Sequence, residues 1–557
     1  MTILFDEDKQ VRKLSDLHHK EEEDLVQILS GKYNVEYVNL LGTPVSTDAL
    51  RLMKEDAARE AKIAPFALIN KRLKVATRNP QDEKTLAALA ELKSKGYEPE
   101  VYITSTQSLE KAWKMYKDLS FAYESKAGAL DISSDEISMI IEKAKSLPTI
   151  ISILENTISA KKIYRVSRIL ETIVAGALAI NASDIHLEPE QDYVLLRYRL
   201  DGVLVEVVKF DNETYALLLS RLKLISGMKL NIKKDAQDGR FSIRLSFGDI
   251  EVRASILPGA YNESVVLRLL NPKSIDVPLE SLGIHPKLLA VLEKEMNRPD
   301  GMILTTGPTG SGKTTTLYAF IKKIHTPQIK IITIEDPIEY HLPGIVQTQV
   351  NEKGYTFVEG LRAAVRQDPD IIMVGEIRDN ETADIAINSA LTGHLVFSTL
   401  HTNDAAGTFP RLIDLGVNSK VITSALRVAM AQRLVRKLCE YCKIEAPVEG
   451  DDQQEIETTL IGIEDKALLP AQTGKMWKAV GCEKCNKTGY KGRVGIYEAI
   501  LTDEKIESAV EMNPSEREIW AAAKGQGLLT MKQDGVLKVL EGTTSLEELE
   551  RVITLTD

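Results

Sequence analysis

The sequence has no long hydrophobic run and no leader of the secretory type. Its longest apolar stretch, residues 169–180, is shorter than the roughly 20 residues that cross a bilayer, and it contains Glu171. The opening residues, MTILFDEDKQVRK, lack the cationic and then apolar order of a signal peptide. These absences argue against a secreted or membrane-spanning protein and predict one that stays in the cytosol.

The sequence also lacks an excess of positive charge. Its formal net charge is −11, and no stretch interleaves basic with aromatic residues. A broad surface for a polyanion needs clustered Lys and Arg, and strand stacking needs aromatic side chains beside them. We therefore expect no stable nucleic-acid binding, although a local basic groove is compatible with an acidic total.

Cysteine is the third scarcity. All four cysteines lie in two C-x-x-C pairs, Cys439 with Cys442 and Cys482 with Cys485. A reducing cytosol disfavours structural disulfides, so pairs at this spacing indicate metal or redox chemistry.

The length of 557 residues predicts three or four domains. Alternating short apolar strands and helical patterns indicate α/β units, since hydrophobic periodicity distinguishes the two kinds of element. We expect the following organisation: an N-terminal α/β domain with a charged helical lead at 1–122, a helical linker at 123–165, a second α/β unit at 166–275, a linker at 276–298 and a third α/β domain at 299–557.

A phosphate-binding loop opens the third domain. An apolar run ends in GPTGSGKT, a complete G-x-x-x-x-G-K-[ST] motif, and a helical segment follows. Glycines let backbone amides wrap phosphate oxygens, the helix N-terminus adds a positive dipole end, and Lys313 can reach the β- and γ-phosphates. Thr314 is expected to hold Mg²⁺. The residues expected to contact ATP here are Gly307, Pro308, Thr309, Gly310, Ser311, Gly312, Lys313, Thr314 and Thr315.

Three later apolar strands are each bordered by polar side chains. Because ligands bind at the carboxyl ends of parallel strands, these side chains are expected to meet at the nucleotide. Acidic groups at neighbouring strand ends suit Mg²⁺ binding and water orientation. The residues are Glu335, Asp336 and Glu339 after the first strand, Glu376 and Arg378 after the second, and His394 before and His401 after the third. His401 is expected to sense the γ-phosphate.

These motifs resemble those of the secretion and pilus ATPases of type II secretion and type IV pilus systems. GPTGSGKTTTLY is similar to the Walker A motif of that family, TIEDPIEY to its Asp box, RQDPDIIMVGEIRD to its Walker B motif and STLHTNDA to its His box. The resemblance covers about residues 166–557 and extends more weakly to 33–119.

The resemblance implies an α/β multidomain fold: a RecA-like P-loop ATPase domain, a PAS-like α/β unit before it, and a small additional N-terminal α/β domain. It further implies a homo-hexamer that hydrolyses ATP at the cytoplasmic face of the inner membrane, held there peripherally through an inner-membrane platform protein. The family's cyclic-di-GMP-binding N-terminal version carries paired Arg/Gly/Leu motifs that residues 1–150 lack, so that ligand is not predicted.

The resemblance also assigns roles to single residues. Arg253 and Arg268 match the family's arginine-finger positions, where a planar guanidinium stabilises charge on the transferred phosphoryl group. Arg240 is a weaker third candidate. The alternative for these arginines is ion pairing on a strand surface. Glu339 is implied as the catalytic glutamate and Glu376 as the Walker B acid near Mg²⁺.

The two cysteine pairs, separated by 39 residues, can supply four thiolates to one tetrahedral Zn²⁺. Such a site, expected within residues 436–492, has no open position and is structural. The intervening chain is expected to form an excursion of its own. A thioredoxin-like redox pair is the alternative. In the resembling family this insert accompanies assembly and export ATPases and is absent from retraction ATPases.

Three kinds of function follow from these motifs. The leading hypothesis is a motor that assembles type IV pili or pseudopili, with type II secretion as its close alternative. A RecA-like motor that moves nucleic acid is the contrasting class. A scaffold without hydrolysis is a third possibility, disfavoured by the intact Lys313, Thr314, Glu339 and Glu376.

Overall fold

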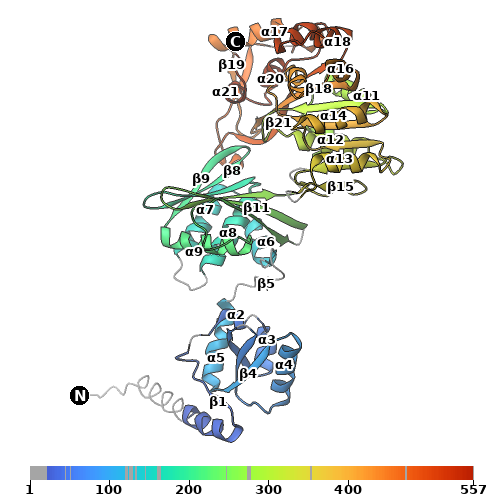
Figure 1. Ribbon diagram of the computed structural model, residues 1–557. Helices are drawn as coiled ribbons and strands as arrows, with labels where there is room; N and C mark the ends of the chain where they lie inside the picture. Colours follow the sequence, from blue (N-terminus) through green and yellow to red (C-terminus); the bar gives the residue numbers. More distant parts are fainter. Residues whose placement is uncertain are drawn as a thin grey trace, which may run out of the picture. The chain divides into compact units, whose positions relative to one another are not determined.

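The computed structural model describes residues 22–555 except for 44, 51, 70, 119–122, 125–128, 132–133, 145, 160–164, 246–247, 272–276, 352–353, 464 and 471–472 (Figure 1). The chain forms two compact units, one made of Met1–Ile137 with Thr157–Glu171 and the other of Ser138–Asn156 with Thr172–Asp557. Most of the expected helical lead, residues 1–21, lies outside the described residues; residues 22–33 are helical.

The first unit contains a four-stranded sheet in the order β1-β4-β3-β2. Its strands are β1 (Glu36–Tyr37), β2 (Ile63–Ile69), β3 (Arg72–Thr77) and β4 (Glu98–Ile103). The helices with it are α2 (Thr47–Leu50), α3 (Glu55–Glu60), α4 (Glu83–Ser94) and α5 (Thr106–Lys114). The N-cap Ser105 accepts a hydrogen bond from Ser108 N and so begins α5. β2, α4 and β4 continue the alternation of strands and helices expected of the N-terminal α/β domain.

The helical character expected of residues 123–165 is partly found. α6 (Ser134–Lys143) and α7 (Leu147–Ser159) lie there, together with the short strands β5 (Tyr123–Glu124) and β6 (Ala129–Asp131), which pair with each other. The chain then enters α8 (Arg165–Ala179).

The second unit begins with an antiparallel sheet whose strands within this unit run in the order β10-β11-β12-β7-β8-β9. They are β7 (Asp184–Pro189), β8 (Val194–Leu200), β9 (Val203–Phe210), β10 (Gln237–Leu245), β11 (Gly248–Pro258) and β12 (Glu263–Leu270). One face is covered by α9 (Asn212–Ile225) and by α8 from residue 172 onward. Tyr198 donates to Ile173 O on this face at 2.6 Å. Strict alternation along β8 and β11 leaves the other face polar.

A seven-stranded sheet forms the core of the third domain, in the order β15-β14-β16-β17-β13-β18-β21. Its strands are β13 (Gly301–Thr306), β14 (Ile331–Glu335), β15 (Val346–Gln349), β16 (Ile371–Val374), β17 (Leu395–Leu400), β18 (Leu426–Leu438) and β21 (Tyr490–Leu501). All neighbours pair in parallel except β18 with β21. Apolar cores fill both faces of the sheet, which explains the unbroken apolar runs of its strands.

Helices cover the two faces of this sheet (Figure 1). They include α12 (Lys313–Ile324), α13 (Phe357–Val365), α14 (Asn380–Leu391), α15 (Thr408–Asp414) and α16 (Ser419–Ala425). Because β13, β14, β16 and β17 are parallel, the loops that follow them leave the sheet at the same edge, which we call the nucleotide edge.

The segment expected to be a linker, 276–298, is packed rather than free. It contains a short 3-10 turn, η2 (Leu279–Ser281), and α11 (Pro286–Met296). Leu288, Leu292 and Met296 recur every four residues and join the core formed with β13 and α12. This spacing places one apolar stripe on α11 against the sheet, so the third domain begins earlier than expected.

The last helices of the third domain are α18 (Glu504–Val510), α19 (Glu516–Ala523), α20 (Met531–Leu540) and α21 (Leu546–Val552). Between β18 and β21 the chain makes the expected excursion. It contains an antiparallel pair of short strands, β19 (Ile444–Pro447) and β20 (Lys475–Lys478), with α17 (Asp451–Ile461) between them in the sequence. Among the described residues, no helix combines the length and apolar character needed to cross a membrane.

Candidate functional site

The phosphate loop connects β13 to α12 in a conformation that requires glycine. Gly307, Gly310 and Gly312 all have positive φ, at 145°, 80° and 92°. A Cβ on Gly307 would lie 2.5 Å from Gln432 O and 2.7 Å from Ser311 Oγ. The loop is therefore held close to β18, and its backbone leaves room for a phosphate to approach.

Lys313 is the first residue of α12, and its Nζ donates to Gly307 O at 2.7 Å and Pro308 O at 3.2 Å. Loss of water around the ammonium lowers its pKa, and the charge of Glu376 opposes this shift. Ser311 Oγ is buried and has no hydrogen-bond partner among the described residues. A cradle of glycines, an orphaned buried hydroxyl and a desolvated cation fit an incoming phosphate group.

The other loop residues lie around this cradle. Pro308 and Thr309 are exposed, whereas Thr314 and Thr315 in the first turn of α12 are half-buried. Their positions follow from the strand, loop and helix order expected for the motif.

Glu376 lies where three loops of the nucleotide edge meet. It is contacted by Arg378, which follows it on the same loop, and by His401 beyond β17, whose Nε2 is 3.3 Å from Glu376 Oε2. Arg378 also lies 4.0 Å from Asp336 Oδ2, beyond β14. The structure thus brings together polar residues that the sequence separates by more than 60 positions.

The charge on Glu376 is stabilised by these contacts. Burial acts to raise the pKa of its carboxyl, but the hydrogen bond and charge of Arg378, with a smaller contribution from His401, outweigh burial and lower it. An ionised carboxylate at this edge, beside Lys313, is suited to a divalent cation.

Arg253 and Glu339 face each other within the second unit. Arg253 Nη2 is 3.6 Å from Glu339 Oε2, and Arg253 also lies 4.0 Å from Glu251 on its own strand. Both partners are about 30% exposed, at 27% and 29%, so the pair is open to a ligand that competes for the guanidinium.

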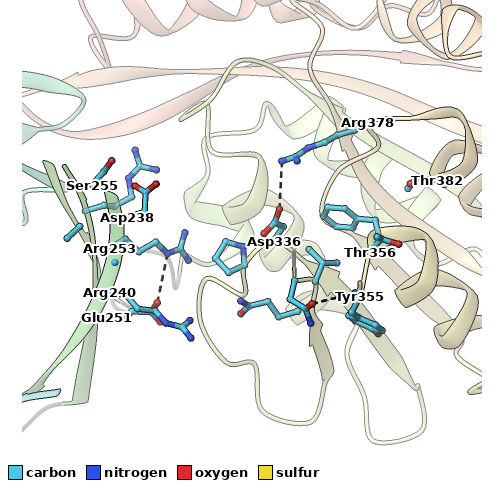
Figure 2. Close-up of a pocket in the computed structure, with 18 of the residues that line it drawn as sticks. Asp238, Arg240, Glu251, Arg253, Ser255, Asp336, Tyr355, Thr356, Arg378 and Thr382 are labelled. Carbon is cyan, nitrogen blue, oxygen red and sulfur yellow. Dashed lines mark hydrogen bonds and ion pairs between the residues drawn. The ribbon is translucent and has the colours of Figure 1, made fainter. Parts of the chain in front are cut away.

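A cavity of about 1160 Å³ separates the polar face of the antiparallel sheet from the nucleotide edge (Figure 2). Its lining includes Arg253 and Arg268 on one side and Asp336 and Arg378 on the other. The residues of the phosphate loop are not part of that lining.

Three arginines form a row across β10, β11 and β12, which we call the arginine ladder. Arg240 pairs in register with Arg253, and Arg253 with Arg268. Directly opposite residues point to the same face, and like charges there destabilise a sheet. The chain carries this cost on the face that lines the cavity, as expected where an anion binds.

Within the ladder, Arg268 lies closer to a carboxylate of its own sheet than Arg253 does, at 3.1 Å against 4.0 Å. Its Nε donates to Asp184 Oδ1 at 3.1 Å, and Arg199 lies 3.4 Å from the other oxygen of Asp184. Arg268 remains 57% exposed.

Glu335 is placed differently from the expectation that it contacts the nucleotide. Its side chain is 3% exposed and accepts hydrogen bonds from Tyr318, Thr333 and Gln347. Burial raises the pKa of this carboxyl, and the hydrogen bonds from Thr333 and Tyr318 oppose the shift. Glu335 therefore ties α12 and β15 to β14 in this structure and does not open onto the nucleotide edge.

His394 also lies away from the other polar residues. It precedes β17 at the opposite edge of the sheet, and its Nδ1 lies 3.0 Å from Ser389 O. Since His401 follows the same strand, the two histidines are separated by the whole length of β17.

Gln432 and Arg433 were missed by sequence reasoning. Gln432 Nε2 donates to Ser311 O at 2.7 Å, and Arg433 Nη2 donates to Asn403 O at 2.9 Å. They brace the phosphate loop and the loop that carries His401. The available signal was a polar Gln-Arg pair that interrupts the apolar residues 428–435 of β18.

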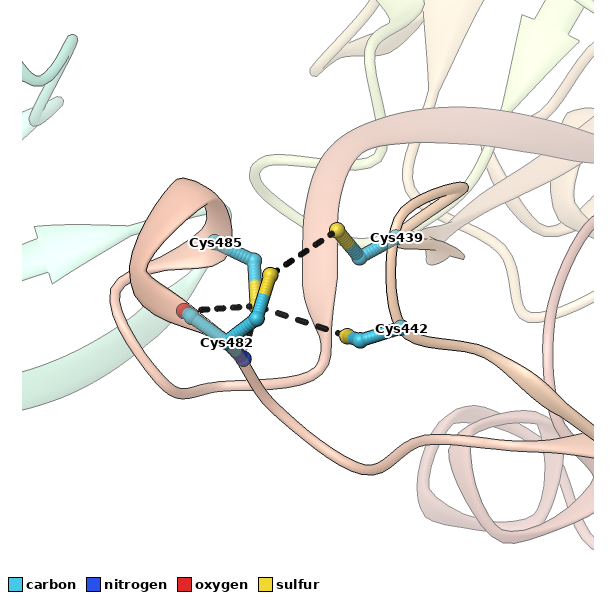
Figure 3. Close-up of side chains that lie close together, drawn as sticks. All are labelled: Cys439, Cys442, Cys482 and Cys485. Carbon is cyan, nitrogen blue, oxygen red and sulfur yellow. Dashed lines mark hydrogen bonds between the residues drawn. The ribbon is translucent and has the colours of Figure 1, made fainter.

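The four cysteines meet in one cluster, with all sulfur atoms within 4.8 Å of one another (Figure 3). The Sγ atoms of Cys439 and Cys482 lie 3.9 Å apart, those of Cys442 and Cys485 3.8 Å, and those of Cys482 and Cys485 3.7 Å. A tetrahedral zinc with Zn–S distances of about 2.3 Å separates its sulfurs by about 3.8 Å. The geometry therefore fits a four-thiolate metal site.

Backbone groups support thiolates at this cluster. Gly481 N donates to Cys442 Sγ at 3.3 Å, and Cys485 Sγ accepts from Cys482 N at 3.1 Å and Gly489 N at 3.3 Å. Burial acts to raise the pKa of Cys485, but the two N–H donors and the neighbouring thiols lower it to about 7, whereas burial raises the pKa of Cys439 and Cys442. Neither pair lies in a βαβ unit, which the redox alternative would need.

The fold and the phosphate loop define a RecA-like P-loop ATPase with a separate N-terminal α/β unit, as the sequence predicted. Residues 159–551 match the family model described as Type II/IV secretion system protein, and residues 33–121 match the MshEN domain model. The chain belongs to the type II/IV secretion system protein family.

Two relatives and one solved structure illustrate the range of similarity. Type II secretion system protein E of Pseudomonas aeruginosa is 45% identical over 386 residues, which is 69% of this chain and 75% of that protein. The type IV pilus assembly ATPase PilB of Myxococcus xanthus is 35% identical over 95% of this chain and 91% of its own length. The structure of the pilus retraction motor PilT with bound ADP is 28% identical, with a TM-score of 0.45, over 68% of this chain and 95% of that chain.

Proposed function

We propose that this protein hydrolyses ATP to drive the assembly of type IV pili through an inner-membrane platform protein. ATP hydrolysis follows from the family and from the complete phosphate loop with its acidic strand ends.

The extent of similarity to PilB favours pilus assembly. PilB of Myxococcus xanthus aligns with 95% of this chain, including the N-terminal α/β unit, whereas type II secretion protein E of Pseudomonas aeruginosa aligns with 69%. The N-terminal unit is the part of such a motor that is free to recruit a system-specific partner. Its presence in the pilus relative is therefore the observation that carries this choice.

The nucleotide is held by the phosphate loop. The backbone amides of Gly307–Thr315 and the Nζ of Lys313 bind phosphate oxygens, and the carbonyl contacts of Lys313 are exchanged for the β- and γ-phosphates. Thr314 and the ionised Glu376 would hold Mg²⁺, which neutralises phosphate charge. Asp336 is connected to this carboxylate through Arg378, which lies 4.0 Å from Asp336 Oδ2 and contacts Glu376.

Glu339 orients and deprotonates the attacking water. His401, which contacts Glu376, is the residue that senses the γ-phosphate. Arg253 Nη2 lies 3.6 Å from Glu339 Oε2. A γ-phosphate competes for the guanidinium, so ATP binding frees the Glu339 carboxylate for water. Arg253, Arg268 and, more remotely, Arg240 then stabilise charge that develops on the transferred phosphoryl group.

Closure of the cavity is the mechanical step. The arginine ladder lines one wall and the nucleotide edge the other, so an anion between them draws the two walls together. Six subunits in a ring would convert this closure into movement of the platform protein. The motor acts in the cytoplasm, peripherally at the inner membrane.

The cysteine cluster binds structural Zn²⁺ through Cys439, Cys442, Cys482 and Cys485. Four thiolates complete a tetrahedral shell and leave no position for a substrate. Bound there, the ion would hold together two loops that a 39-residue excursion separates.

Replacing Glu339 by Gln tests the assignment of the base. We expect hydrolysis to fall by about 10²- to 10⁴-fold, since an amide cannot take the proton, while ATP binding is retained. Glu376→Gln is the comparison, because loss of a Mg²⁺ ligand weakens binding of Mg·ATP as well. A Glu339→Gln protein that turns over normally would refute the assignment.

Type II secretion is the second candidate, favoured by the 45% identity to protein E of Pseudomonas aeruginosa. Deleting the gene and restoring it with the Glu339→Gln form separates the two. Loss of surface pili with normal secretion supports assembly of pili, and the reverse supports secretion. Strong stimulation of the ATPase by DNA would instead favour a nucleic-acid motor.

A further inference from the structure

A buried carboxylate outside the nucleotide edge has two backbone partners from distant segments. Glu498, on β21, is 4% exposed. Its Oε1 accepts from Ala405 N and its Oε2 from Met531 N, each at 2.9 Å. One side chain thus connects a loop that follows β17 with a helix near the end of the chain.

The first partner belongs to the loop that carries His401. This loop, residues 401–407, is also anchored by Thr402 N, which donates to Thr306 Oγ1 at 2.8 Å, and by Arg433, which donates to Asn403 O at 2.9 Å. Thr306 ends β13 immediately before the phosphate loop. Glu498 is therefore one of three anchors on a loop whose start contacts Glu376.

The second partner is the first residue of α20. Met531 follows the N-cap Thr530, whose side chain accepts from Gln533 N. The first N–H groups of a helix have no partner within it, so a carboxylate there satisfies one and complements the helix dipole. Glu498 consequently joins the histidine loop to the C-terminal helices.

The environment makes the charge of Glu498 costly. Burial is the largest influence and raises its pKa to about 7, the two N–H donors oppose this, and of the charged neighbours Asp404 adds to the shift while Arg433 reduces it. Because this folded-state pKa lies above the ordinary value of 4.5, the ionisation of Glu498 lowers the stability of the fold as pH rises from about 4.5 to about 7.

Glu548 on α21 is a natural contrast. It is also buried, at 1% exposure, and accepts from the backbone N of Arg436. Its carboxylate additionally accepts from the guanidinium groups of Arg436 and Arg551. Burial acts to raise the pKa of Glu548, but these cations lower it. The charge of Glu548 therefore stabilises the fold, while that of Glu498 does not.

We propose that Glu498 is a positioning residue for ATP hydrolysis, whose two oxygens fix the histidine loop to the first turn of α20. This inference rests on the proposed ATPase function. A carboxylate is needed because only it accepts from two converging N–H groups with separate oxygens. Movement of the C-terminal helices is thereby transmitted to His401 and Glu376.

The first experiment replaces Glu498 by Gln. An amide keeps one acceptor and turns its NH₂ toward the other N–H donor, so one tie is lost. We expect kcat to fall about 10- to 100-fold, the range that small misplacement of catalytic groups produces. Affinity for ATP should stay within about threefold, because the phosphate loop is untouched.

Glu548→Gln is the matched control for this variant. It removes a buried carboxylate of the same kind from the C-terminal helices but makes no contact with the histidine loop. We expect a lower midpoint of thermal unfolding with kcat unchanged. Equal losses of kcat in the two variants would mean that Glu498 acts only through folding, which overturns the proposal.

A second pair of variants tests the helix end of the tie. Proline is well tolerated at the first position of a helix, and Thr530, with φ −73° and ψ 162°, already has the extended conformation that precedes proline. Met531→Pro removes the N–H that Glu498 accepts, whereas Met531→Ala removes the side chain alone. We expect a several-fold lower kcat for Met531→Pro than for Met531→Ala.

The outcomes separate this proposal from the proposed function. If Glu498→Gln keeps kcat within twofold, or if ATP affinity falls in parallel with kcat, the positioning role is wrong while hydrolysis stands. Equal kcat for Met531→Pro and Met531→Ala also overturns it. If the unsubstituted protein and Glu548→Gln hydrolyse no ATP, the proposed function itself fails.

Discussion

The nucleotide edge and the cysteine cluster are both built from residues far apart in the chain, yet one is open and the other closed. At the edge, Ser311 Oγ is buried without a partner among the described residues, and Arg253 pairs with Glu339 at 3.6 Å through side chains that are partly exposed. In the cluster, four sulfurs already stand at the spacing of a complete metal shell. A buried hydroxyl without a partner and a partly exposed ion pair mark a site for a ligand that binds and leaves. Four sulfurs at the spacing of a complete metal shell mark a structural site.

Lys313→Ala should have the largest effect and sharpen this contrast. Without the ammonium, charge on the β- and γ-phosphates is unbalanced, so we expect hydrolysis to fall by about 10³-fold. Zinc content, measured on the purified protein, should not change. Lys323→Ala, at an exposed position of the same helix, is the control and should hydrolyse ATP normally.

The arginine ladder predicts an ordered pair of effects. Arg253→Ala should lower kcat by up to about 10³-fold, in the range of other arginine fingers. Arg268→Ala should cost less, because part of its charge is already taken up by Asp184 at 3.1 Å. Steady-state kinetics of both variants measure the order. If both variants lose almost no kcat, the arginines of the ladder only form ion pairs on the sheet surface.

Removing the metal should affect stability more than chemistry. We expect Cys442→Ser, or a strong chelator, to lower the unfolding midpoint of the cysteine module, since a structural zinc contributes folding energy directly. ATP affinity should stay within about threefold, because Lys313 and its loop are not part of the cluster.

Metal analysis and calorimetry check this prediction. A protein isolated without metal whose module withstands the chelator would remove the basis of the zinc assignment. Loss of nucleotide binding on chelation would mean that the cysteine cluster and the phosphate loop, which we describe as separate sites, depend on each other.

Glu335→Gln should have the smallest effect. The carboxyl is enclosed by Tyr318, Thr333 and Gln347, and burial raises its pKa, so a neutral amide of the same shape is tolerated. We expect kcat within about threefold of the parent. A loss of kcat as large as that of Glu339→Gln would mean that Glu335 contacts the nucleotide, as its place in the motif first indicated.

Much of the fold was predictable because its signals are local. Apolar runs such as β13 and β16 identify strands buried on both faces, and GPTGSGKT identifies the turn between β13 and α12. The prediction of a linker at 276–298 was wrong because the packing of this segment depends on contacts with distant residues. The apolar stripe of α11 is visible in the sequence, but the surface against which it packs is known only from the structure.

The candidate site was predictable as a set of residue types but not as an arrangement. In the sequence, Glu335 and Glu376 have equivalent positions, each at the end of an apolar strand. The structure separates them, since alternation along β14 turns Glu335 into the core while the loop after β16 directs Glu376 to Arg378 and His401.

The sequence by itself determined the chemistry that is available: a phosphate loop, acidic strand ends and two thiolate pairs. These depend on residue types at short spacing, which local geometry alone constrains. Only the tertiary structure decided the register that lines up Arg240, Arg253 and Arg268, and the buried tie of Glu498 to Ala405 and Met531. Such contacts join distant segments, and their energy depends on burial, which exists only once the core has formed.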